Sequence, residues 1–80
     1  MAIYALDHRH TPAECGVAFA AWRCFDSRLR TRPVLASCSS DGHRMLWTVE
    51  ARDAPAALGL LPPWVAERTE VERMWEVGLP

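Results

Sequence analysis

The sequence predicts an α+β domain with the element order β-α-β-β-α-β, in which two helices cover one face of an antiparallel sheet. Three observations support this prediction: a helix start at Thr11-Pro12-Ala13-Glu14, a turn at Asp41-Gly42, and alternation of apolar and polar side chains in several segments. A chain of 80 residues has room for one domain, so we expect residues 1–80 to form a single domain.

The first half of the chain begins with a predicted strand at residues 2–10, where side chains alternate and no helix cap occurs. A helix is predicted at residues 12–25, because Thr11 can cap it and Glu14 completes a capping box. An apolar stripe at helical spacing supports this helix: Cys15, Ala18, Phe19, Trp22 and Phe25.

The second and third strands are predicted at residues 34–39 and 44–51, joined by a two-residue turn at Asp41-Gly42. Such a turn would pair Ser40 with His43, Cys38 with Met45, Ala36 with Trp47, and Val34 with Val49. These pairs share an apolar face, whereas the opposite face is mixed in character and carries Leu35, Ser37, Leu46 and Thr48.

A second helix is predicted at residues 54–61, with Asp53 as its cap and Pro62-Pro63 as its interruption. The last strand is predicted at residues 70–77, where apolar and charged side chains alternate. Right-handed crossovers then favour the ferredoxin-like arrangement with the sheet order 4-1-3-2.

Composition narrows the possible partners and the compartment. All nine basic residues are Arg and the net charge is -1, so no basic surplus favours nucleic acid. No apolar run is long enough to cross a bilayer and the N-terminus lacks a secretory pattern, so we expect no membrane association. The three cysteines Cys15, Cys24 and Cys38 cannot all pair within one chain, which favours reduced thiols in the cytoplasm.

The apolar content predicts self-association. A chain of this length buries only about 60% of its unfolded surface, yet it carries four Trp, two Phe and one Tyr. The face of the sheet without helices would still expose apolar residues, either Leu35 and Leu46 or, if the two faces are reversed, the apolar residues of the opposite face. We therefore expect a homodimer in which two sheets pack face to face.

The predicted topology gathers all three histidines at one end of the sheet. His8 and His10 lie two residues apart on one strand and share a face, and His43 begins the neighbouring strand. Three imidazoles so placed predict a site for a divalent transition metal, Zn, Ni or Cu. As residues near a strand end, the two histidines of the first strand are expected to contribute little to the core. Cys38 lies one step further along the hairpin, and Cys15 fits a buried, inert thiol.

Two other functions remain open. A histidine beside Asp7 could act as a general base, with Arg9 or Arg44 holding an anionic substrate. A cofactor-free enzyme of this kind would have a closed pocket with a histidine inside it. The chain could also be an accessory interaction domain without chemistry.

The β-α-β-β-α-β plan, the short chain, the Pro-interrupted second helix and the closing alternating strand resemble small bacterial dimeric α+β-barrel proteins. That resemblance implies a homodimer that binds a ligand between sheet and helices. Its members include muconolactone isomerase-like enzymes, cofactor-free monooxygenases, polyketide cyclases and small metal-binding proteins. No catalytic residue is carried over from them. The leading hypothesis is a small ligand-binding homodimer that holds a metal, and the alternative is a cofactor-free isomerase, cyclase or monooxygenase.

Overall fold

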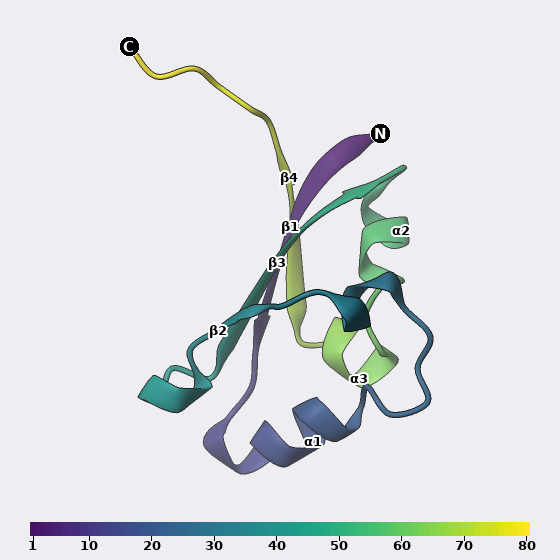
Figure 1. Ribbon diagram of the computed structural model, residues 1–80, viewed down its shortest axis with the longest axis vertical. Helices are drawn as coiled ribbons and strands as arrows, with labels where there is room; N and C mark the ends of the chain where they lie inside the picture. The colour runs from purple at the N-terminus through teal and green to yellow at the C-terminus, as the bar shows by residue number, and fades with distance from the viewer.

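The computed structural model describes residues 1–80 and contains one four-stranded antiparallel sheet (Figure 1). Its strands are β1 (Ala2–Arg9), β2 (Leu35–Ala36), β3 (Arg44–Ala51) and β4 (Thr69–Met74). They lie in the order β2-β3-β1-β4, which places β1 between the two other long strands. β1 pairs with β3 along its whole length and with β4 from Ile3 to His8.

The core lies between one face of the sheet and the short helices beside it. Strand alternation buries every second residue of β1 and β3, so Leu6 faces Trp47 on one side and Val71 on the other. Residues from the helical side complete this core: Leu29, Ala57, Leu61 and Val65. The alternation predicted for the first and third strands is confirmed, and the structure shows that the face with Met45, Trp47 and Val49 is the buried one.

The prediction of a single helix at residues 12–25 is wrong. Instead, a 3₁₀ turn, η1 (Pro12–Glu14), leads into the short helix α1 (Cys15–Ala20). The Glu14 carboxylate does accept a hydrogen bond from the Thr11 N–H at 2.9 Å, as a capping box requires. The helix ends early because the Trp22 and Arg23 N–H groups bond to carbonyls only three residues back. This tightening directs Trp22 onto Trp47, with ring centroids 5.8 Å apart.

The second predicted helix is also divided. α2 (Ala54–Leu58) begins at Asp53, whose carboxylate accepts a hydrogen bond from the Ala56 N–H at 2.9 Å, so this cap is confirmed. α3 (Pro63–Ala66) begins after Pro62, because proline cannot donate the backbone hydrogen bond that would continue α2. Both helices lie beside the same face of the sheet (Figure 1).

The ferredoxin-like βαββαβ prediction is therefore wrong for this chain, and with it the dimeric α+β-barrel class. The order 2-3-1-4 names the same strand neighbours as 4-1-3-2 does from the other edge. What overturns the class is the helical layer, because the α-helices have six, five and four residues in place of two long crossover helices. The structure is a small α+β domain with an antiparallel sheet and few helices.

The predicted two-residue hairpin turn at Asp41-Gly42 is wrong as well. Ala36 pairs with Met45 rather than with Trp47, and residues 37–43 form a wider turn. That turn contains the 3₁₀ helix η3 (Cys38–Ser40), and the Gly42 N–H donates to the Ser37 carbonyl at 2.8 Å. The strand predicted at residues 34–39 consequently shortens to β2, and Cys38 leaves the ladder.

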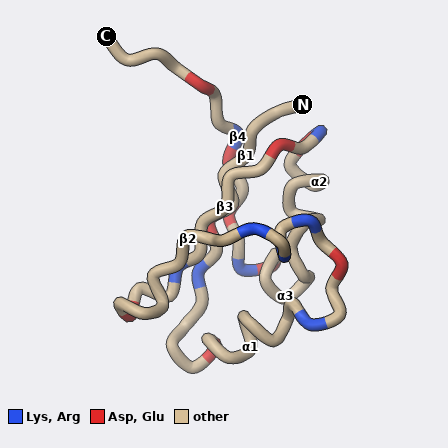
Figure 2. The backbone as a smooth tube through the Cα atoms, in the orientation of Figure 1, with Lys and Arg blue, Asp and Glu red and all other residues tan.

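The last strand ends earlier than its alternating pattern predicts. Met74 pairs with Ile3, and the chain leaves the sheet there because β1 offers almost no further residues to pair with. The final residues extend away from the domain (Figure 1), so the strand predicted at residues 70–77 is shorter than expected. Acidic and basic residues are interspersed along the chain (Figure 2). None of the helices has the length and apolar character needed to span a bilayer.

Candidate metal centre

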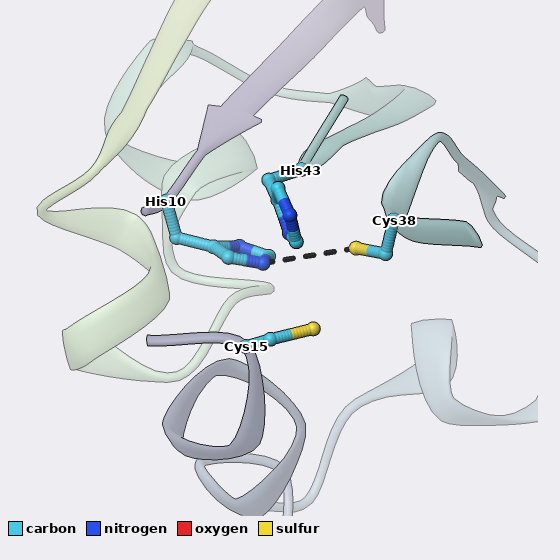
Figure 3. A group of neighbouring side chains, drawn as sticks. All are labelled: His10, Cys15, Cys38 and His43. Carbon is cyan, nitrogen blue, oxygen red and sulfur yellow. Dashed lines mark hydrogen bonds between the residues drawn. The ribbon is translucent and has the colours of Figure 1, made fainter. Parts of the chain in front are cut away.

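Four side chains that can bind metals meet at the end of the sheet where β1 finishes and β3 starts (Figure 3). They are His10, Cys15, Cys38 and His43, and their ligand atoms all lie within 4.8 Å of one another. A tetrahedral zinc ion separates its nitrogen and sulfur ligands by about 3.3–3.8 Å. The largest separation in the group therefore exceeds the spacing in a tetrahedral zinc site by only about an ångström.

The backbone holds the two histidines together. The His10 N–H donates to the His43 carbonyl at 3.2 Å, which extends the ladder between β1 and β3 by one more bond. The two imidazole centroids lie 5.5 Å apart in an edge-on arrangement. His10 is 8% exposed, and the exposed fraction of the His43 side chain is 12%. Both rings are therefore largely withdrawn from solvent.

His43 is oriented by the turn that precedes it. Asp41 and His43 adopt positive φ angles of 65° and 50°, which only a few residue types tolerate. His43 Nε2 then lies 2.7 Å from Asp41 Oδ1, whereas its Nδ1 is buried with no hydrogen-bond partner. Buried polar atoms are rarely left without partners. In the neutral tautomer in which Nε2 donates its proton to Asp41, the Nδ1 lone pair of His43 is free to bind a metal.

The two cysteines come from segments far apart in the sequence. Cys15 begins α1 directly after the η1 turn, and Cys38 begins η3 in the turn between β2 and β3. Cys38 Sγ lies 3.7 Å from His10 Nε2, the contact drawn in Figure 3. Burial, and secondly the neighbouring Cys15 thiol, raise the pKa of Cys38. The third cysteine, Cys24, is exposed and lies outside this group.

The structure separates His8 from the other predicted metal ligands. It brings His10 and His43 together with the two cysteines, whereas His8 is not part of the group of four. His8 is 0% exposed and lies beside His10, with His8 Nε2 at 2.9 Å from His10 Nδ1. The expectation that strand-end imidazoles contribute little to the core is therefore wrong for His8. Burial lowers the pKa of His8 and of His10, which favours neutral rings.

The arrangement needed for a general base is not formed. Asp7 and His8 are consecutive in a regular strand, so their side chains point to opposite faces of the sheet. Asp7 instead bonds to Arg44, with 2.8 Å between Oδ1 and Nε, and lies 3.6 Å from an Arg9 nitrogen. Asp7 is therefore paired with Arg44 and Arg9 rather than with a histidine.

Sequence reasoning did not include Cys15 and Cys38 among the candidate metal ligands, although the sequence contains a signal for them. Four residues separate His10 from Cys15, and four residues again separate Cys38 from His43. A pair of ligands on each side of a longer insertion is typical of structural zinc sites. The mirror-symmetric spacing H-x₄-C and C-x₄-H could have pointed to all four residues.

No protein-family model, curated protein or solved structure matches this chain.

Proposed function

We propose that this chain is a zinc-binding domain in which His10, Cys15, Cys38 and His43 hold one Zn²⁺. The observation that carries the proposal is the convergence of two thiols and two imidazoles on one point, within 4.8 Å of one another. A tetrahedral set of two sulfur and two nitrogen ligands is typical of zinc. Nickel and Cu²⁺ prefer other ligands and tetragonal geometries, so we propose zinc among the three candidate metals.

The proposed role of the ion is structural. Four protein ligands fill a tetrahedral shell, whereas catalytic zinc keeps a position for water or substrate. None of the surface pockets is lined by any of the four ligands. The geometry therefore supports a closed centre.

The architecture explains why such a centre would be useful. Only 15 of the 80 residues are buried, and α1 contributes Ala18 alone to them. One ion would join the end of β1, the start of α1, the residue 37–43 turn and the start of β3. Small domains with limited cores commonly depend on such metal links.

The direct test is the metal content of protein purified without a polyhistidine tag. We expect one zinc per chain by elemental analysis. Replacement with Co²⁺ should produce thiolate-to-metal charge-transfer absorption and the visible bands of a tetrahedral site. A wild-type protein that binds neither ion in reducing buffer would overturn the proposal.

The ligand set is tested with cysteine variants, for which the chain supplies its own control. Cys15→Ser and Cys38→Ser should each lose tight zinc binding and the charge-transfer band, because a hydroxyl does not replace a thiolate at zinc. Cys24→Ser should keep both, since Cys24 is exposed and outside the group. Equal behaviour of the three variants would contradict this assignment of ligands.

A further inference from the structure

His8 lies directly behind the proposed zinc ligand His10 and does not itself face the ion. Strand alternation turns the His8 ring into the core, where it is 0% exposed. A buried imidazole needs partners for both ring nitrogens, and the nature of those partners determines which nitrogen carries the proton.

The partners of His8 Nδ1 are both acceptors. The Val65 carbonyl lies 3.2 Å from Nδ1, and the Thr69 hydroxyl oxygen lies 3.4 Å from it. The Thr69 hydroxyl gives its own proton to the same Val65 carbonyl at 2.7 Å, so it offers only a lone pair to His8. A carbonyl cannot donate a hydrogen bond. The proton of a neutral His8 ring therefore sits on Nδ1.

This placement determines the tautomer of the next ring. His8 Nε2 is left as an acceptor, and it lies 2.9 Å from His10 Nδ1. His10 must then donate from Nδ1, which leaves a lone pair on its Nε2. The opposite tautomer of His10 would set two lone pairs against each other at 2.9 Å. His10 Nε2 is the atom that lies 3.7 Å from Cys38 Sγ within the group of four.

We infer that His8 is a positioning residue that fixes the tautomer and ring orientation of His10, and so presents the Nε2 lone pair of His10 to the metal. This inference rests on the proposed zinc site. Its role parallels that of Asp41, which bonds to the outer nitrogen of His43. Partners of this kind typically contribute about 10- to 100-fold to metal affinity. Unlike the exposed Asp41, His8 is itself held by Val65 and Thr69 in the core.

The first test uses the metal-free wild-type protein and needs no zinc. Nitrogen-15 shifts of the imidazole rings, recorded in two-dimensional long-range correlation spectra near neutral pH, identify the protonated nitrogen of each neutral histidine. We expect His8 and His10 both to carry their proton on Nδ1. A His10 ring protonated on Nε2 would overturn the inference. Because no metal is present, this result is independent of whether the chain binds zinc.

The second test separates positioning from packing. His8→Gln retains an acceptor that can reach His10 Nδ1, whereas His8→Phe fills similar space without one. We expect about 10- to 100-fold weaker zinc binding for His8→Phe and a loss of only a few-fold for His8→Gln, measured by competition with a chromophoric chelator. His10 should also lose its Nδ1–H preference in His8→Phe alone.

The outcomes of the second test are distinct. Equal losses in both variants would show that His8 acts by packing alone, and unchanged affinity in His8→Phe would show that it does not act on the site. Either result overturns the inference while leaving the zinc proposal intact. If His8→Phe does not fold by circular dichroism, His8→Leu makes the same comparison with a smaller apolar side chain. A failure of the wild type to bind zinc would refute the zinc proposal, and the tautomer measurement would still decide the relation between His8 and His10.

Discussion

Individual residues in the 37–43 turn determine how Cys38 and His43, two members of the group of four, are placed. Cys38 leaves the strand because the Ser37 carbonyl accepts hydrogen bonds from both Ser40 and Gly42. At position 42 a Cβ atom would clash with the Ser37 hydroxyl oxygen, so only glycine fits there without a shift. The requirement for glycine is steric, since its φ angle is not positive.

At this scale we predict that Gly42→Ala loosens the site. The added methyl group must displace Ser37, which moves Cys38 and His43 apart and destabilises the protein by about 1–3 kcal/mol. Thermal unfolding would measure the loss of stability, and competition with a chelator would measure the loss of zinc affinity. Gly16→Ala is the control, because nothing lies within 4 Å of that Cβ and alanine stabilises a helix by about 0.5–1 kcal/mol. A neutral Gly42→Ala would show that the turn adapts freely.

At the level of elements, α1 and the 37–43 turn are the parts of the fold with the least apolar support. α1 buries only Ala18, and neither residue of β2 is buried. β1 and β3, by contrast, form the long central ladder and supply most of the core. The proposed zinc would therefore matter most for the two weakly packed segments, which provide Cys15, Cys38 and His43.

We predict that removing zinc with a chelator releases these segments first. Amide hydrogen exchange should accelerate at residues 15–20 and 37–43, while the middle of β1 and β3 stays protected. Mass spectrometry of peptides before and after chelation would measure this difference. Uniform acceleration across the sheet would instead indicate that the metal supports the whole fold, and no acceleration would argue against a structural role.

At the scale of the whole molecule, the face of the sheet without helices carries exposed apolar side chains. Leu35 is 74% exposed there, Leu46 is half-buried, and the paired charges of Asp7 and Arg44 lie beside them. The homodimer through this face stays a prediction. Covering such apolar area would contribute roughly 25 cal/mol for each Å² removed from water.

We predict that Leu35→Glu weakens this association without changing the zinc content, because Leu35 lies outside the group of four ligands. Sedimentation at micromolar concentration should show a dimer for the wild type and a shift toward monomer for the variant. Val17→Glu, at an exposed position of α1, is the control that should leave the dimer unchanged. A wild-type monomer at that concentration would refute the prediction.

Local patterns in the sequence determined much of this fold. Period-two alternation was enough to predict which residues of β1 and of β3 share a face, and the Asp53 side chain was enough to place the start of α2. The clustering of chemistry at one end of the sheet followed from the histidine positions and the strand directions. These features depend on residues close together in the sequence or on strand pairing, so they can be predicted from the sequence alone.

The grouping of the four candidate ligands was decided only by the tertiary structure. Cys38 reaches His10 because the turn forms a 3₁₀ segment in place of two paired residues, and Cys15 reaches them because α1 starts beneath the end of β1. His8 lies outside the group of four and is buried in the core, with Val65 and Thr69 as its partners. Which donors converge depends on contacts between segments as many as 61 residues apart, and no periodicity within one segment records those contacts.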